Sequence, residues 1–271
     1  MDGKKDQKAT SKKNIMIMGY AIAIVLVIMA GISFFSGSRG TKDDMPKTDE
    51  ERVTVEDEAP AVEILHSGDY DYYEDETGVA IVSYSGSDTE LVIPSEIEGK
   101  NVYKIADAAL ANHPEFKKVT IPGNIIWIGA SAFYGDSGIE ELTIEPGVEE
   151  AIIGYFAFNE CDGLKEVTIP GNYLQIDTKT FADCDALEYF KWEENSKSEP
   201  NQRMGGFVFD NCGKLSEVHL SSSVGHIEDP NGYKNSDITI YAPEDSTAIR
   251  IAKENDIKYE IEEAEEASGE E

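Results

Sequence analysis

Residues 164–184 read LKEVTIPGNYLQIDTKTFADC, and this stretch decides the fold. It begins with six residues patterned as a short β-strand whose apolar side chains point inward. Two-residue alternation places Glu166 and Thr168 on the outer face of that strand. Pro170 cannot donate a ladder hydrogen bond, so the strand ends there. Phe181 is expected to fill the interior from the opposite wall, because an aromatic ring supplies a large buried area.

The same pattern recurs along the chain, and its spacing predicts a repeat fold. The last apolar residues of the successive strands are numbers 93, 121, 144, 169, 192, 220 and 240, so the steps are 28, 23, 25, 23, 28 and 20 residues. Between the strands a second signature recurs, a small or β-branched residue followed by Phe or Leu. It stands at residues 109–110, 132–133, 157–158, 180–181 and 208–209. One strand in every period of about 20–30 residues predicts a solenoid. Each unit then buries its apolar side only against its neighbours, in one continuous core.

The repeated unit resembles that of the BspA-like bacterial leucine-rich repeat family. The pattern L-x-x-V-T-I-P, followed by I-G-x-x-A-F-x-x-C, stands with variations at residues 116–136, 139–161 and 164–184. The resemblance covers roughly Tyr70 to Ile261. It implies a β-rich (α/β) solenoid displayed at a cell surface for adhesion or binding, with no catalytic residues.

Both ends of the repeat region also resemble that family. Residues 81–86 and 93–100 are similar to its N-terminal β-hairpin cap and first repeat. Residues 246–255 are similar to its short C-terminal capping helix, with Ser246 as the N-cap, and a last strand follows at 257–261.

The fifth unit departs from the pattern, because a polar insert occupies residues 193–206. We expect this insert to form a surface loop. Loops on a rigid scaffold often carry binding residues, but a solenoid also tolerates insertions that have no function.

The N-terminal part has a different composition, which predicts a membrane anchor. Residues 15–35 contain no charged side chain, and as a helix rising ~1.5 Å per residue they would span a bilayer core of about 30 Å. The run is longer than the apolar region of a signal peptide and lacks a small-x-small cleavage site. An uncleaved signal-anchor helix is therefore favoured over a cleaved signal peptide. Lysines in residues 1–14 place that end in the cytoplasm.

This topology predicts a single-pass protein of the plasma membrane with its C-terminal domain outside the cell. The predicted parts are a cytoplasmic N-terminus (1–14), a transmembrane helix (15–35), an acidic disordered stalk (36–60), an extracellular leucine-rich-repeat domain (61–261) and an acidic disordered tail (262–271).

The charge and the motifs of the chain exclude several function classes. The 54 acidic and 23 basic residues give a net charge of −31 and a pI near 4.3. Nucleic acid is bound mainly by Lys and Arg that neutralise phosphates, so we expect no nucleic-acid partner. The sequence contains no G-x-S-x-G, H-E-x-x-H, C-x-x-C or phosphate-binding loop. We therefore expect a non-enzymatic protein without cofactor or metal.

The three cysteines, Cys161, Cys184 and Cys212, fall on one repeat position. Stacked repeats place equivalent atoms about 4.8 Å apart, so Cys161–Cys184 or Cys184–Cys212 could form a disulfide outside the cell. A ladder of small buried apolar residues is the favoured interpretation. A metal site that adds His113 and Asp136 from the same column is disfavoured, because ligands in a straight line make a poor tetrahedron.

The outward strand positions form two columns, which are the candidate binding face. One column reads Lys118, Glu141, Glu166, Tyr189 and Glu217, and the other reads Thr120, Thr143, Thr168, Lys191, His219 and Thr239. Adjacent Glu141 and Glu166 would repel each other, which suggests that the face meets a cationic partner or divalent ions. The alternative is a solvated face whose threonines reflect β-propensity. The residues predicted to contact a partner are Lys118, Glu141, Thr143, Glu166, Thr168, Tyr189, Lys191, Glu217 and His219.

The function predicted from the sequence is that of a membrane-anchored extracellular leucine-rich-repeat module for binding or adhesion. It would recognise a protein or a cell-wall polymer. The alternative is an accessory or sensory subunit that regulates another membrane complex. The sequence leaves the oligomeric state open.

Overall fold

The computed structural model describes residues 62–195, 200–228 and 237–263. The predicted cytoplasmic segment, transmembrane helix and stalk lie outside these residues, as does the tail beyond residue 263. Within these three ranges, no helix has the length and apolar character needed to cross a bilayer. The residues from Leu65 onward form one compact unit, which holds the repeats.

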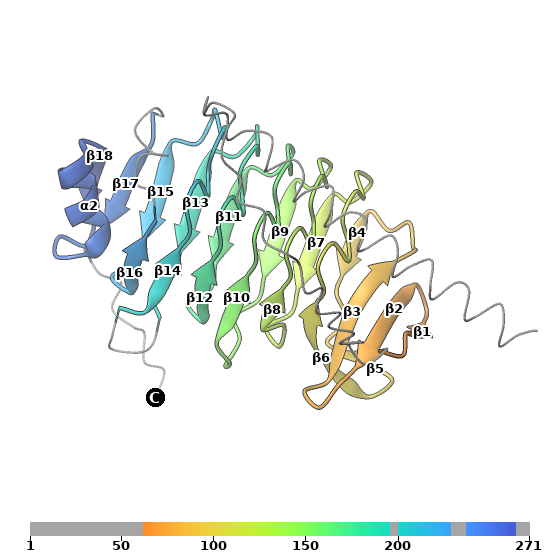
Figure 1. The fold of residues 1–271 in the computed structure, drawn as a ribbon. Coiled ribbons are helices and arrows are strands. Elements are labelled where there is room, and N and C mark those ends of the chain that lie inside the picture. Colours follow the sequence, from red (N-terminus) through yellow and green to blue (C-terminus); the bar gives the residue numbers. More distant parts are fainter. Residues whose placement is uncertain (1–61, 196–199, 229–236, 264–271) are drawn as a thin grey trace, which may run out of the picture. The chain divides into compact units, whose positions relative to one another are not determined.

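The strands of this unit form two layers, and the chain alternates between them turn by turn (Figure 1). The back layer is one sheet in the order β1 (Leu65–Ser67), β2 (Tyr70–Glu74), β3 (Val79–Tyr84), β6 (Lys100–Ile105), β8 (Trp127–Ile128), β10 (Ala151–Ile153), β12 (Tyr173–Ile176), β14 (Gln202–Met204) and β16 (Val224–Ile227), with β5 (Glu96–Ile97) paired to β6. The front layer holds β4 (Glu90–Val92), β7 (Lys118–Ile121), β9 (Glu141–Ile144), β11 (Glu166–Ile169), β13 (Tyr189–Trp192), β15 (Glu217–Leu220), β17 (Thr239–Ala242) and β18 (Lys258–Ile261). The predicted solenoid is thereby confirmed.

The front layer is divided into two sheets, which the sequence did not indicate. One sheet has the order β4-β7-β9 and the other the order β11-β13-β15-β17-β18. Pairing β9 with β11 in the repeat register would set Glu141 directly opposite Glu166. Like charges in that position are destabilising, which is a physical reason for the interruption. β9 and β11 remain in contact although they are not paired in one sheet, so the column that holds these two glutamates crosses the boundary between the sheets.

The interior between the layers is built around a column of large apolar side chains, one per turn. Its members are Leu110, Phe133, Phe158, Phe181 and Phe209, all buried. The rings of Phe133 and Phe158 stack with centroids 5.0 Å apart, and those of Phe158 and Phe181 with centroids 5.4 Å apart. The predicted role of Phe181 in filling the interior is confirmed.

Successive turns approach each other closely where the front strands end. The turn predicted after Pro170 is present, since the Tyr173 N–H donates to the Pro170 carbonyl over 3.1 Å. A Cβ atom on Gly171 would lie only 1.9 Å from the carbonyl oxygen of Glu194 in the next turn. Only glycine therefore fits at this position, and the Pro-Gly pair sets the spacing of the turns there.

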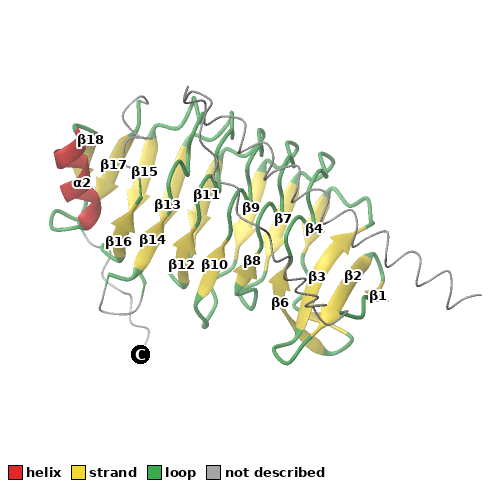
Figure 2. Ribbon diagram, in the orientation of Figure 1, coloured by secondary structure: helices red, strands yellow, loops and turns green. Residues whose placement is uncertain are grey.

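Both ends of the solenoid have the predicted capping elements. At the N-terminal end β2 and β3 form an antiparallel pair. At the C-terminal end lies α2 (Thr247–Asn255), the only helix among the residues that the structure describes (Figure 2). The Ser246 hydroxyl accepts a hydrogen bond from the Ile249 N–H, as an N-cap does, and Asp256 with φ of 58° ends the helix.

The polar insert at 193–206 is not simply a surface loop, which corrects that expectation. Its residues 202–204 form strand β14 of the back layer. Gln202 is fully buried, and its amide nitrogen donates to the carbonyls of Gly171, Tyr173 and Glu193. A polar side chain tolerates this burial because its hydrogen bonds are made within the fold.

Candidate functional site

The structure places the nine predicted partner-binding residues on outward positions of the front layer. Lys118, Glu141 and Thr143 lie on the β4-β7-β9 sheet, where Lys118 Nζ and Glu141 Oε2 are 2.8 Å apart. The other six lie on the β11-to-β18 sheet, and they are Glu166, Thr168, Tyr189, Lys191, Glu217 and His219. The predicted face is therefore divided between two sheets that adjoin where β9 contacts β11.

The second group follows the predicted columns over three strands. Glu166 pairs with Tyr189 and Tyr189 with Glu217, while Thr168 pairs with Lys191 and Lys191 with His219. Parallel pairing in register makes each column a row of neighbouring side chains on one face.

The assignment of Thr239 to the column of His219 is wrong by two residues. In the structure Thr239 pairs with Glu217, and Tyr241 is the residue opposite His219. The repeat spacing could have indicated the correct register. If the strand ends at residue 242, the step from residue 220 is 242 − 220 = 22 residues, which is closer to the other steps than the step of 20 residues to residue 240. Tyr241 is thus a candidate site residue that the sequence reasoning missed.

This register brings three rings together on the front face. The centroids of His219 and Tyr241 are 4.5 Å apart with the rings nearly parallel, at 8°. On the other side, the centroids of Tyr189 and His219 are 4.8 Å apart. All three side chains are partly exposed, so the ring row is accessible from solvent.

A cleft of about 230 Å³ lies beside this ring row, and we call it the acidic aromatic cleft. Its lining includes Tyr189, Lys191, Trp192, His219, Glu262 and Glu263. Glu262 is held there because its N–H donates to the Ala242 carbonyl, and Glu262 Oε1 lies 3.0 Å from His219 Nδ1. The chain that follows β18 therefore contributes to the site, although the sequence reasoning assigned it to the tail.

The electrostatics of the cleft are dominated by carboxylates. Burial raises the pKa of Tyr189, with Glu262 and Glu217 adding to the rise and Lys191 opposing it. The pKa of Tyr241 is also raised, first by desolvation and then by Glu260, Glu217 and Glu262. Both phenols therefore sit in a negative potential, because negative charge nearby disfavours the phenolate.

The three cysteines form the predicted buried ladder, and each is a free thiol. The Sγ atoms of Cys161, Cys184 and Cys212 lie 3.4, 3.2 and 3.0 Å from the carbonyl oxygens of Phe133, Phe158 and Phe181, one turn earlier. The possible disulfides are therefore not formed. Within the described ranges there is also no group of three or more His, Cys, Asp or Glu placed to hold a metal ion.

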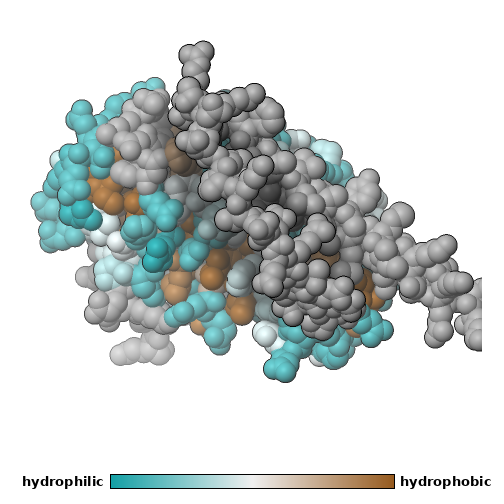
Figure 3. Space-filling model, in the orientation of Figure 1, coloured by the Kyte–Doolittle hydropathy of each residue, from teal (hydrophilic) through white to brown (hydrophobic). Residues whose placement is uncertain are grey.

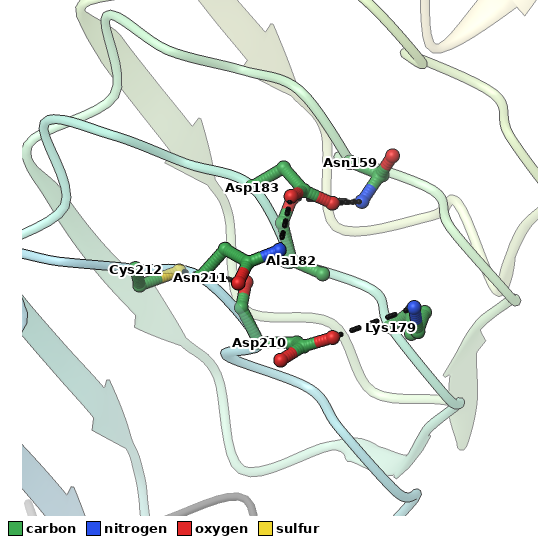
Figure 4. A network of polar contacts seen from close by, with 7 residues as sticks. All are labelled: Asn159, Lys179, Ala182, Asp183, Asp210, Asn211 and Cys212. Atoms are coloured by element: carbon green, nitrogen blue, oxygen red, sulfur yellow. Dashed lines mark hydrogen bonds and ion pairs between the residues drawn. The ribbon is translucent and has the colours of Figure 1, made fainter. Parts of the chain in front are cut away.

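A polar network beside the last cysteine ties three successive turns together (Figure 4). Asp183 accepts hydrogen bonds from Asn159 Nδ2 at 3.1 Å and from Asn211 Nδ2 at 2.7 Å. Lys179 and Asp210 form an ion pair at 3.4 Å. These contacts between turns stabilise the scaffold, so we assign no binding role to them.

Burial of the thiols predicts their reactivity. Burial raises the pKa of the Cys161 thiol, and only the thiolate is nucleophilic, so the folded chain should resist iodoacetamide. We expect almost no labelling under native conditions and three labels per chain in denaturant, measured by intact mass. Rapid native labelling of all three thiols would contradict the buried ladder.

Comparisons with known proteins agree with this architecture. The model of the BspA type leucine rich repeat region matches residues 103–239 in six copies. No curated protein matches the chain. Among solved structures, the pneumococcal vaccine antigen PcpA is 20% identical, with a TM-score of 0.50 over 61% of this chain and 46% of that chain. A leucine-rich repeat protein of T. pallidum is 18% identical, with a TM-score of 0.48 over 71% of this chain and 95% of that chain. At these identities the likeness is one of fold, whereas the family match spans half of the sequence: the chain belongs to the BspA-type leucine-rich repeat family.

Proposed function

We propose that this protein is a membrane-anchored extracellular module that binds a protein or cell-wall partner through the front face of its solenoid, without catalysis. The observation that carries the proposal is the ring row on β13, β15 and β17, where Tyr189, His219 and Tyr241 stand partly exposed on a regular sheet. Aromatic side chains that pack in an ordered row yet remain open to solvent are typical of binding surfaces.

The different environments of inward and outward side chains on the front strands support a binding role. Inward strand positions such as Val167 and Phe190 are fully buried and serve the core. The outward positions have no such constraint, so they can vary with the partner while the scaffold stays rigid. Binding through such a face needs shape and charge alone, and no catalytic group.

The anchor is supported by composition. Residues 15–35 are uncharged and long enough to span a bilayer, and lysines precede them. With the N-terminus in the cytoplasm, the repeat domain would stand outside the cell on the segment 36–60. Its acidic surface would keep it soluble there.

A capture experiment with two baits tests this proposal. The first bait is the fragment 61–263, which retains Glu262, and the second is the full chain. An adhesion module should retain a surface partner with the fragment alone. A fragment carrying Glu166→Lys and Glu217→Lys should lose at least about tenfold in retained partner, because like charges then meet across the interface.

Two outcomes would contradict the proposal. If only the full chain retains partners, and these are membrane proteins, the chain is instead a regulatory subunit of a membrane complex. If the charge-reversed fragment captures as much as the unchanged fragment, the front face is not the contact surface. The fragment with Lys165→Glu, an exposed change outside the two columns, is the matched control.

A further inference from the structure

We propose that the acidic aromatic cleft binds an arginine or lysine side chain presented by an extended segment of a partner protein. This inference rests on the proposed function and names the chemistry of the partner. It is argued from the rings, the charges, one unsatisfied nitrogen and the neighbouring sheet edge.

The rings provide faces suited to a cation. The faces of Tyr and Trp attract ammonium and guanidinium groups through the ring quadrupole, within about 6 Å of the centroid. Tyr189 borders the cleft directly, and His219 and Tyr241 continue the same row at centroid distances of 4.8 and 4.5 Å. His219 and Tyr241 each cover one face of the other, so Tyr189 is the tyrosine that the cleft offers to a cation, and a planar guanidinium stacks on an aromatic face in a way that an ammonium cannot, which favours arginine over lysine.

The charges around the cleft select against anions. Of the described residues that line it, Glu193, Glu194, Glu262 and Glu263 are acidic and Lys191 is the only lysine or arginine. Glu194 is fixed by hydrogen bonds from Ser222, whose hydroxyl lies 2.7 Å from Glu194 Oε1. The same face repels a carboxylate or phosphate and attracts a basic group at long range.

One nitrogen in the cleft has no hydrogen-bond partner among the residues that the structure describes. His219 Nε2 is shielded from water and unpaired, and the nearest carboxylate oxygen, on Glu217, lies 3.6 Å away, beyond hydrogen-bond length. The Glu262 carboxylate at Nδ1 favours the tautomer with its proton there, which leaves Nε2 as an acceptor. The Glu217 side chain is half exposed, at 50%, so its movement would open Nε2 to a guanidinium donor.

The neighbouring sheet edge favours a peptide as the source of that cation. Within the described parts of the chain β18 pairs with β17 alone, and all four of its residues are exposed. The chain runs from β18 directly into Glu262 and Glu263 of the cleft. An extended segment can add main-chain hydrogen bonds to such an edge while a side chain enters the adjacent pocket.

The surface around this edge suits such a partner. In Figure 3 hydrophilic residues cover most of the α2 end, with small hydrophobic patches between them. Tyr259 and Ile261 of β18 are 39% and 53% exposed. Apolar contacts with these two side chains would add affinity to the charged contact in the cleft.

Trp192 provides a direct readout of binding. The chain has two tryptophans, and Trp192 lines the cleft whereas Trp127 lies on β8 of the other layer. The full chain with Trp127→Phe, purified in detergent, therefore reports on the cleft alone. It is titrated with short acetylated peptides that carry Arg, Lys or Gln at one central position and are otherwise identical.

We expect the Arg peptide to change Trp192 fluorescence saturably, the Lys peptide to bind more weakly and the Gln peptide not to bind. Glu217→Gln with Glu262→Gln should weaken Arg-peptide binding by about tenfold or more. The matched control, Glu141→Gln with Glu145→Gln, removes the same charge from the other front sheet and should change binding by less than about twofold.

Three results would overturn the proposal. The first is equal binding of the Arg and Gln peptides, and the second is an equal loss of Arg-peptide binding in the control variant. The third is binding of a glucosamine oligomer, which represents a cell-wall partner, without binding of the Arg peptide. The experiments distinguish failure of this cleft proposal from failure of the proposed binding function. If the full chain with Glu217→Gln and Glu262→Gln still retains its surface partner, the binding module stands and only this cleft is excluded.

Discussion

Phe181→Ala is expected to lower the free energy of unfolding by about 4 kcal/mol, because a buried Phe-to-Ala change costs roughly 3–5 kcal/mol. Phe181 is fully buried and lies at the centre of the interior column. Its ring stacks on Phe158 at 5.4 Å, and it meets Phe190 at 5.8 Å and Phe209 at 6.4 Å. The alanine variant loses these contacts and leaves a cavity that the neighbouring turns can only partly close.

The measurement is urea unfolding of the full chain followed by circular dichroism. Phe181→Leu is the matched control, since leucine already fills this column at Leu110. It should cost less than half as much as the alanine variant. Because each turn packs only on its neighbours, the alanine variant should also broaden the transition. If the free energy of unfolding falls by less than about 1 kcal/mol, the column of large apolar side chains is not a main source of core stability.

The interior could be predicted from sequence because it repeats. Phe133, Phe158 and Phe181 recur at one position of the unit, and a side chain that recurs with the period must face its equivalent in the next turn. The same reasoning placed Cys161 and Cys184 in one buried ladder, as the structure has them. The position of a residue in the repeat therefore predicts its neighbours in such a column, whatever the conformation of the loops that connect the turns.

Features that occur once in the sequence were not predictable in this way. The burial of Gln202 is accommodated by three carbonyls near its amide, two of them in the preceding turn and one at the start of the insert, and no local pattern reveals those partners. Tyr241 joined the site only through a register shifted by two residues. Glu262 reaches His219 through its side chain, while its backbone N–H still donates to Ala242 at the end of β17. The candidate cleft therefore depends on contacts between distant segments, whereas the face that holds it could be located from strand alternation.

Asp136→Asn is expected to stabilise the chain at about pH 8 and to change its stability little at about pH 4. Asp136 is fully buried at the position that Cys161 occupies one turn later. Its Oδ1 accepts a hydrogen bond from the His113 N–H at 2.7 Å, but its Oδ2 has no partner among the described residues. Desolvation raises the pKa of this carboxyl to about 8, with the charge of Glu115 adding to the rise and the His113 hydrogen bond opposing it.

The sign follows from proton binding in the two states. An unfolded Asp has a pKa of about 3.9, so between about pH 4 and pH 8 the folded chain holds a proton that the unfolded chain has released. The free energy of unfolding therefore falls as the pH rises through this window, by up to about 1.4 kcal/mol per pH unit, and levels off above it. The stability that protonated Asp136 contributes is fully present below about pH 4 and is lost by the time the folded group ionises.

Asparagine cannot ionise, so the difference in unfolding free energy between the variant and the wild type isolates this one group from the many other carboxylates. The difference should grow from near zero at about pH 4 to several kcal/mol in favour of Asn at about pH 8. Asp185→Asn, an exposed change next to Cys184, is the matched control and should give only a small difference. A pH-independent difference for Asp136→Asn would mean that Asp136 titrates as an ordinary carboxyl, and that water or a rearranged partner reaches Oδ2 in solution. Growth of the difference with pH would instead establish that a neutral carboxylic acid occupies, in this turn, the column that later turns fill with thiols.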